Sequence, residues 1–135
     1  MLEWNREILI QKAIEAKKMA YAPYSQFHVG AALLGKSGKI YTGCNVENSS
    51  YPAGICGERT AISKAVSEGE TEFQAIAIAG SLKDQDAEQY CMPCGICRQV
   101  MAEFCKEDFI ILAVKNEIDY KEMTLGELLP ESFHL

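Results

Sequence analysis

The chain has little of three things: histidine, long apolar runs and basic charge. Its 135 residues include only two histidines, and 13 Lys and Arg stand against 19 Asp and Glu, for a net charge of −6. Scarce histidine argues against a histidine-rich metal site. No apolar run approaches the roughly 20 residues needed to span a bilayer. The acidic balance argues against a nucleic-acid binder, which usually presents a basic face.

The beginning of the sequence also lacks the apolar stretch of a secretory signal peptide, because residues 1–7 include the charged Glu3, Arg6 and Glu7. We therefore expect a cytoplasmic protein with no membrane partner, in which the six cysteines stay reduced. Repeats, low-complexity stretches and linkers are missing as well. The length is typical of one domain with its own hydrophobic core, and we expect a single domain over residues 1–135.

What is present is an alternation of helical and strand patterns. Helices are expected at 4–20, 56–68 and 94–106, a weakly helical segment at 124–129, and strands at 27–34, 39–46, 74–79 and 109–114. The second and third strands, and the third and fourth, are each joined through a helix. Such connections predict parallel crossovers, with helices covering both faces of the sheet. The pattern therefore predicts an α/β fold.

Three cysteines fall where helices are expected to begin. Cys94 and Cys97 share one face of a first helical turn, and Cys56 opens another helix about forty residues earlier. Helix N-termini favour thiolates. Three thiols suit Zn²⁺ with one position left for water, and Glu58 lies where it can move protons without binding the metal. Neither His28 nor His134 has ligand spacing to these cysteines.

The other cysteines leave alternatives open. Cys44 and Cys105 fit core packing. Cys91 completes a C-x-x-C-x-x-C run with Cys94 and Cys97, which suggests iron–sulfur ligation or a closed four-cysteine zinc site. Position 101, where a ferredoxin-type run would continue, is Met, and a closed site would leave Glu58 without a role.

The motifs resemble those of the zinc-dependent cytidine deaminases, in particular the short homotetrameric type. The resemblance rests on Cys56-Gly57-Glu58-Arg59 and on the segment 93–100, Pro-Cys-Gly-Ile-Cys-Arg-Gln-Val. It extends to Ala22-Pro23-Tyr24-Ser25, Phe27, Val29-Gly30-Ala31-Ala32-Leu33, Asn45-Val46-Glu47-Asn48, Tyr51-Pro52, Leu128-Leu129-Pro130 and Phe133. It implies a three-layer α-β-α fold with a mixed sheet of about five strands.

The resemblance also implies a mechanism. One Zn²⁺ per subunit activates water for attack on C4 of the base, while Glu58 takes up and returns protons. The products are uridine or 2′-deoxyuridine and ammonia, in pyrimidine salvage. Three thiolates outweigh the charge of Zn²⁺, so the site needs positive charge from the helix N-termini and from Arg59, which is implied to hydrogen-bond ligand sulfurs.

Nucleoside-holding residues follow from the same resemblance. Phe27 is implied to stack on the base, and Asn45 and Glu47, expected on one face of a strand, to bind the ribose 3′-hydroxyl. The backbone N–H of Gly57, a position where Ala is usual, is implied to bind the pyrimidine carbonyl. Tyr51 and Phe133 are implied to reach a neighbouring subunit's site in a homotetramer.

Other functions remain possible at this point. A nucleic-acid-editing deaminase would share the zinc motif, but the acidic charge disfavours it. A deaminase of a related cytosine nucleoside such as blasticidin S is a nearer alternative. From another class, the runner-up is a non-catalytic zinc module.

Overall fold

The structure is a computed structural model that describes residues 4–135. The elements along the chain are α1 (Arg6–Lys17), β1 (Phe27–Gly35), β2 (Ile40–Cys44), the short 3₁₀ helix η1 (Tyr51–Ala53), α2 (Gly57–Ser67), β3 (Phe73–Leu82), α3 (Gly95–Phe104), β4 (Ile110–Val114), β5 (Tyr120–Thr124) and α4 (Leu125–Leu128). The start of the N-terminal segment considered as a signal peptide, residues 1–3, lies outside the described residues.

The five strands form one mixed sheet in the order β2-β1-β3-β4-β5. β1 pairs antiparallel with both β2 and β3, β3 pairs parallel with β4, and β4 pairs antiparallel with β5. The crossover through α3 therefore joins neighbouring parallel strands, as expected. The crossover through α2 spans β1, which lies between β2 and β3. The predicted mixed sheet of about five strands is confirmed.

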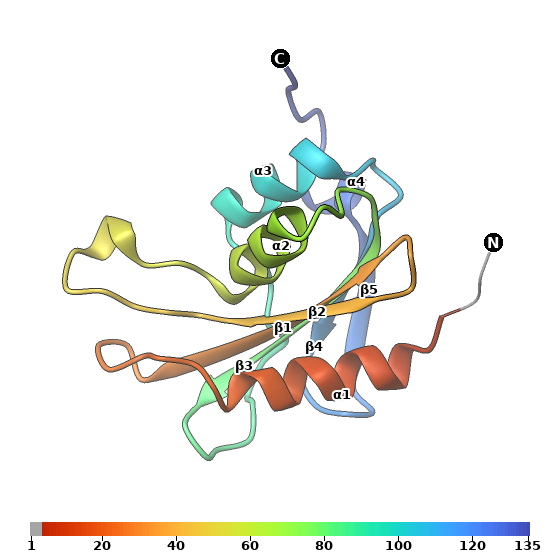
Figure 1. Ribbon diagram of the computed structural model, residues 1–135. Coiled ribbons are helices and arrows are strands. Elements are labelled where there is room, and N and C mark those ends of the chain that lie inside the picture. Colours follow the sequence, from red (N-terminus) through yellow and green to blue (C-terminus); the bar gives the residue numbers. More distant parts are fainter. Residues whose placement is uncertain (1–3) are drawn as a thin grey trace.

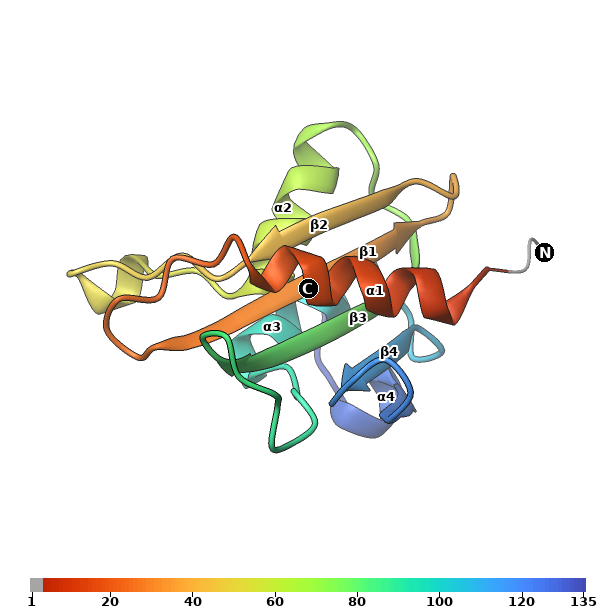
Figure 2. The same cartoon turned by 90° about the horizontal axis from the view of Figure 1, so that it is seen from below.

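Helices cover both faces of the sheet, so the molecule has the predicted three layers. α1 lies across one face, and α2 and α3 lie side by side on the other (Figures 1 and 2). The core is correspondingly split. Leu9, Ile10 and Ala13 of α1 pack on one face, while side chains of α2 and α3 such as Ile62 and Met101 pack on the other.

A close approach between α2 and β2 positions the start of α2. A Cβ atom at Gly43 would lie 2.4 Å from the backbone nitrogen of Ala61 and 2.6 Å from the carbonyl oxygen of Gly57. Helix and strand backbones are therefore in direct contact, which only glycine permits. The Lys64 ammonium adds a hydrogen bond to the carbonyl of Thr42 on the same strand. This contact fixes the first turns of α2 over the edge of the sheet.

The strand β5 was not predicted from the sequence. β5, with the sequence Tyr-Lys-Glu-Met-Thr, is an edge strand on which no residue is fully buried. Its charged residues hide the alternation that marks a strand. The predicted helical segment at 124–129 is present as α4, where Thr124 and Glu127 form a reciprocal capping box. Within residues 4–135, none of the helices is both long and apolar enough to cross a membrane.

The β1–β2 hairpin is tied to the loop after α2 by the carboxylate of Glu70. It accepts hydrogen bonds from the backbone and hydroxyl of Ser37, at 2.9 and 2.7 Å, and from the hydroxyl of Tyr41 at 2.9 Å. These bonds, led by the one from the Ser37 backbone, lower the pKa of Glu70. A lowered folded-state pKa stabilises the fold above the unfolded-state pKa, and that stabilisation is lost as the pH falls.

We therefore expect Glu70→Gln to lower the free energy of unfolding at pH 7 by about 1–2 kcal/mol, the scale of hydrogen bonds to a charged acceptor. The difference from wild type should shrink as the pH drops below about 4. Urea unfolding at several pH values measures this. Glu72→Gln is the control, because Glu72 is exposed and meets only Lys36, at 3.5 Å. Equal effects of both substitutions at every pH would show that the hydrogen bonds of Glu70 do not stabilise the fold.

Candidate active site

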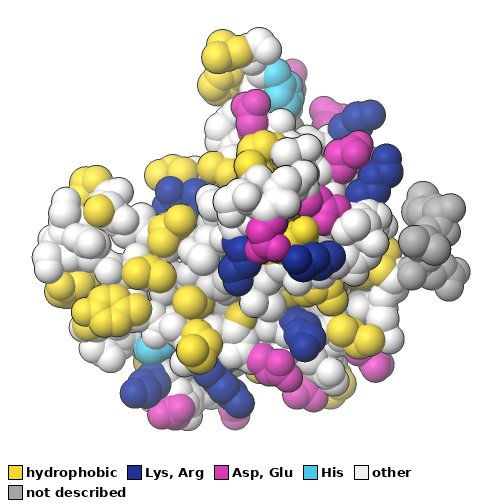
Figure 3. Space-filling view, viewed as in Figure 1, with side chains coloured by type: hydrophobic (Ala, Val, Ile, Leu, Met, Phe, Trp, Pro, Cys, Tyr) yellow, Lys and Arg dark blue, Asp and Glu magenta, His cyan; other side chains and the backbone are white. Residues whose placement is uncertain are grey.

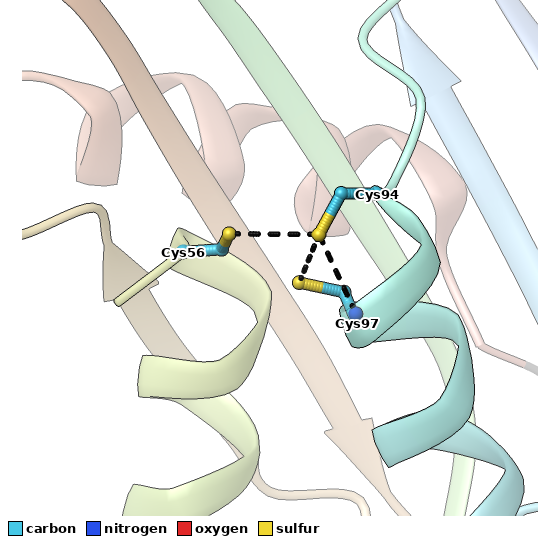
Figure 4. A group of neighbouring side chains, drawn as sticks. All are labelled: Cys56, Cys94 and Cys97. Carbon is cyan, nitrogen blue, oxygen red and sulfur yellow. Dashed lines mark hydrogen bonds between the residues drawn. The ribbon is translucent and has the colours of Figure 1, made fainter. Parts of the chain in front are cut away.

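Three thiols from two helix starts converge at one point. Cys56 is the N-cap of α2 and Cys94 the N-cap of α3, with Cys97 in the first turn of α3. Their sulfur atoms all lie within 4.8 Å of one another. Figure 4 shows Cys56 facing the other two across the gap between the helices. Cys97 is buried, Cys56 half-buried and Cys94 exposed, so the group is reachable from solvent on one side.

The spacing of these thiols fits zinc. The Cys56 and Cys94 sulfurs are 3.7 Å apart and the Cys94 and Cys97 sulfurs 3.3 Å apart. A tetrahedral ion with Zn–S bonds of about 2.3 Å places its sulfurs about 3.8 Å from one another. The observed separations need only a small expansion to accept the ion. The donor set, three soft thiolates, is also one that zinc prefers.

The pKa values of the thiols also indicate a metal site. Hydrogen bonds from Cys97, Arg59 and Cys94 lower the pKa of the Cys56 thiol to about 5, against the opposing effect of burial. The hydrogen bond with Cys56, together with burial, raises the pKa of Cys97 above its usual range. Protein groups alone therefore stabilise one thiolate at the expense of its neighbour. Three thiolates at this spacing require a cation between them.

Arg59 supplies positive charge beside the group. Its Nη2 lies 3.7 Å from the Cys56 sulfur, and hydrogen bonding to Cys56, followed by charge interactions with Cys56 and Cys97, raises the pKa of the guanidinium further. Its Nε is buried and has no hydrogen-bond partner within residues 4–135. The guanidinium is thus held at the sulfurs although one of its own donors stays unsatisfied.

Glu58 is the most unusual titratable group of the site. It lies in the first turn of α2, two residues after Cys56, and only 4% of its surface is exposed. Burial, and then the negative charge of Cys56, raise the pKa of the carboxyl to about 7. A carboxyl with a pKa near neutrality can both accept and donate a proton, which is the property that general acid–base catalysis requires.

The remaining cysteines lie outside the three-thiol group. Burial, and then the charge of Glu58, raise the pKa of Cys91 to about 12, and its sulfur does not belong to the group of three that lie within 4.8 Å of one another. Cys91 packs beside the core instead, as Cys105 does, and burial likewise raises the pKa of Cys44. The described residues hold a single group of thiols at metal-binding distance, formed by Cys56, Cys94 and Cys97.

Asn45 and Glu47 follow β2 instead of lying within it, because the strand ends at Cys44. The Asn45 side chain accepts a hydrogen bond from the backbone of Val29 at 2.8 Å and donates one to the carbonyl of Phe27 at 2.9 Å. The Glu47 carboxylate accepts bonds from the backbone of Tyr24 and from Ser25. Both side chains therefore reach one segment, residues 24–29, and hold the start of β1.

Phe27, at the start of β1, is 41% exposed, so part of its ring is available to a ligand. A cavity of about 340 Å³ opens nearby. Its lining consists of Tyr24, Ser25, Glu47, Asn48, Tyr51 and Gly54. Tyr51 is 78% exposed and Phe133, near the C-terminus, is 68% exposed. The segments that carry them, the loop with η1 and the C-terminal tail, lie on different sides of the molecule (Figure 1).

Gly57 is packed tightly against the sheet. A Cβ atom there would lie 3.3 Å from Val29 Cγ1 and 3.4 Å from the Cα atom of Cys44. An alanine would therefore need a shift of a few tenths of an ångström but would not point into the three-thiol group. The glycine keeps its backbone N–H at the start of α2, where helix N–H groups lack intrahelical partners.

Periodicity and spacing did not reveal Ser25, whose hydroxyl donates to Glu47 and whose oxygen accepts from the backbone of Phe27 at 3.0 Å. Nor did they reveal Gly80, which lies against the Phe27 ring and the Cys91 sulfur, and they singled out Cys91 only as a possible metal ligand. Ser25 belongs to a turn segment, Ala22-Pro23-Tyr24-Ser25, that the motif comparison did highlight. The packing at Gly80 has no signal in the sequence.

Comparison with known proteins agrees with this geometry. A family model described as the cytidine and deoxycytidylate deaminase zinc-binding region matches residues 3–113. A cytidine deaminase of Halalkalibacterium halodurans is 46% identical over 129 residues, which cover 96% of this chain and 94% of that protein. A cytidine deaminase of Sporosarcina psychrophila is 46% identical over 127 residues, covering 94% and 90%.

Solved structures show the same relationship. The crystal structure of cytidine deaminase from Burkholderia pseudomallei superimposes with a TM-score of 0.88 at 41% identity, covering 96% of this chain and all of that one. The cytidine deaminase of Mycobacterium tuberculosis gives a TM-score of 0.82 at 36% identity, covering 98% and 100%. Fold and site together define a zinc-dependent deaminase. Within this class, the chain belongs to the cytidine and deoxycytidylate deaminase family.

The site predicts a rank order of zinc retention. We expect about one zinc per chain in the wild type, loss of the ion in Cys97→Ser, and a roughly 10- to 100-fold lower affinity in Arg59→Ala, the scale of a lost partner to a metal ligand. Cys91→Ser should keep the ion at full affinity. Elemental analysis and competition with a chromogenic chelator measure these values. Zinc loss in Cys91→Ser would show a fourth ligand and overturn the assignment.

Proposed function

We propose that the protein catalyses the hydrolytic deamination of cytidine and 2′-deoxycytidine to uridine and 2′-deoxyuridine, with release of ammonia. The observation that carries this proposal is the buried Glu58 carboxyl, with a pKa of about 7, two residues from a thiol of the three-cysteine group. The names of the similar proteins, cytidine deaminases in two bacteria, support the substrate.

The reaction needs a nucleophile and a proton shuttle. Zinc held by Cys56, Cys94 and Cys97 would supply Lewis-acid activation of the attacking water. Glu58 accepts a proton from that water and passes it to N3 of the base, which makes C4 electrophilic enough for the water oxygen to add there. Glu58 then takes the remaining proton from the new C4 hydroxyl and delivers it to the amine, so that the C4–N bond breaks, the C4 carbonyl forms and ammonia leaves. The guanidinium of Arg59 offsets part of the negative charge of the sulfurs throughout the reaction.

Binding of the nucleoside falls to residues around the start of β1. Phe27 stacks on the base, and the backbone N–H of Gly57 binds the pyrimidine carbonyl. Asn45 and Glu47 bind the ribose 3′-hydroxyl, which cytidine and deoxycytidine share. Their hydrogen bonds to residues 24–29 support this role, because they hold both polar side chains in place before the ligand arrives.

The decisive experiment is an ultraviolet absorbance assay of cytidine and deoxycytidine with wild type and Glu58→Gln. The wild type should deaminate both nucleosides and lose activity when zinc is chelated. Glu58→Gln should keep its zinc yet lose at least about a hundredfold in kcat, the scale of general acid–base catalysis. Glu103→Gln, the same change at an exposed position of α3, serves as the control and should be unaffected.

Each contrary outcome identifies a different function. A zinc-loaded wild type that is inert on both nucleosides and deaminates blasticidin S would assign the alternative substrate. A zinc-loaded protein inert on all three would favour a non-catalytic zinc module. Normal turnover by Glu58→Gln would remove Glu58 from the mechanism.

We also propose that the active form is a homotetramer in which Tyr51 and Phe133 reach neighbouring sites. Hydrophobic side chains gather on the left of Figure 3, over the loop that carries η1 and the turn before β1. Tyr21, Tyr24 and Val46 in these segments are each more than 40% exposed, and Tyr51 more than 75%. An exposed apolar area of this kind supports a protein–protein contact.

Light scattering should therefore give a mass about four times the 15.0 kDa of one chain. Tyr51→Ala should weaken the assembly or raise KM for cytidine, because its ring lies outside its own subunit's core. Ile118→Ala is a control, since Ile118 is 90% exposed in the β4–β5 turn. A monomeric mass with full activity would refute the tetramer.

We place this activity in pyrimidine salvage in the cytoplasm, with one domain over residues 1–135 carrying all the site residues. The reducing interior of a cell supports this placement, because three closely spaced thiols would otherwise be open to oxidation.

A further inference from the structure

The end of β3 lies under the proposed base-binding region. Ile76 and Ile78 of β3 face α2 and α3, and the alternation of a strand puts Gly80 on the same face. Gly80 is opposite Val29 of β1 in the sheet register, and Phe27 is opposite Leu82. Phe27 is therefore the diagonal cross-strand neighbour of Gly80, within reach for an aromatic side chain.

The Phe27 ring and the Cys91 thiol both lie against Gly80. A Cβ atom at Gly80 would lie 2.8 and 2.9 Å from the ring carbons Cε2 and Cζ of Phe27, and 2.8 Å from the sulfur of Cys91. A real Cβ atom essentially never lies so close to another heavy atom, so the ring tip and the sulfur both occupy the space that a side chain at position 80 would need. Phe27 belongs to β1, whereas the backbone N–H of Cys91 donates a hydrogen bond to the carbonyl of Val114 at the end of β4.

This packing is connected to the reacting centre. Cys91 packs against the same core cluster as Cys56 and Cys97. The sulfur of Cys91 offers the ring a polarisable surface. The exposed part of the Phe27 ring is the surface left for a base to stack upon.

A cavity of about 430 Å³ adjoins the same three residues. Phe27, Gly80 and Cys91 contribute to its lining, together with the loop that follows β3. If an atom were added at Gly80, the ring could move into this space and the fold could persist. The position of the ring is therefore set by the backbone at Gly80 and the sulfur of Cys91, and the surroundings leave it room to change.

We propose that Gly80 and Cys91 form a seat for the Phe27 ring and so determine how well the pyrimidine base stacks. Both are positioning residues that act through Phe27, and their role rests on the proposed function. A displaced ring weakens binding of the nucleoside without touching Glu58 or the metal ligands. The seat should therefore control KM and leave kcat nearly unchanged.

The test compares cytidine kinetics of the wild type, Gly80→Ala, Phe27→Ala and the double variant. Base–aromatic stacking is worth enough for Gly80→Ala to raise KM on the order of tenfold, with kcat within about threefold and zinc retained. In the Phe27→Ala background, Gly80→Ala should raise KM no further, because no ring remains to be displaced. Gly126→Ala, the same change in α4, where the new Cβ would lie 3.1 Å from Glu107 Cβ, is the control.

Cys91→Ala provides a second variant that removes atoms from the seat and so avoids overpacking. It should raise KM about two- to threefold, the scale of a sulfur–aromatic contact, and again only when Phe27 is present. The proposed role of Gly80 and Cys91 would be contradicted, and the proposed function left intact, by either of two results. One is an increase in KM that is as large in the Phe27→Ala background as in the wild type, and the other is a loss of kcat with unchanged KM. An inert wild type would overturn the proposed function and the seat together.

Discussion

The direct contact between the backbones of α2 and β2 at Gly43 is the constraint on which the rest of the site depends. Because no side chain separates helix from strand, the first turn of α2 cannot shift along or away from the sheet. That turn carries Cys56, Gly57 and Glu58, and the beginning of α3 lies beside it. The geometry of three thiols and one carboxyl thus follows from the absence of one Cβ atom.

Electrostatics then decides what this geometry can do. Burial, and then the charge of Cys56, raise the pKa of Glu58, while the hydrogen bond with Cys56, burial and then the charge of Glu58 raise that of Cys97. Zinc, the helix N-termini and Arg59 supply the compensating charge. Burial together with the negative charge of Cys56 keeps the pKa of Glu58 at about 7, where it exchanges protons at neutral pH. The excess negative charge of an all-cysteine site therefore helps to tune its acid–base group.

Much of the site was readable from the sequence because its signals are local. The spacing of Cys94 and Cys97, and the helix starts at Cys56 and Cys94, depend on a few neighbouring residues. β5 was missed by periodicity because an edge strand with exposed charges shows no buried face. Asn45 and Glu47 were expected on a strand, but β2 ends before them. Gly80 was unpredictable, since its role depends on two residues brought in by other segments of the chain.

The three thiols also come from two parts of the chain that the whole of β3 separates. With β3 paired to β1 on one side and to β4 on the other, the sulfurs of Cys56 and Cys94 lie 3.7 Å apart. A slip of one residue in the β1–β3 register would turn Gly80 and its neighbours to the opposite face. Binding of one metal ion by all three sulfurs thus depends on the strand register, and a chain that binds the ion in this way has its central strands correctly aligned.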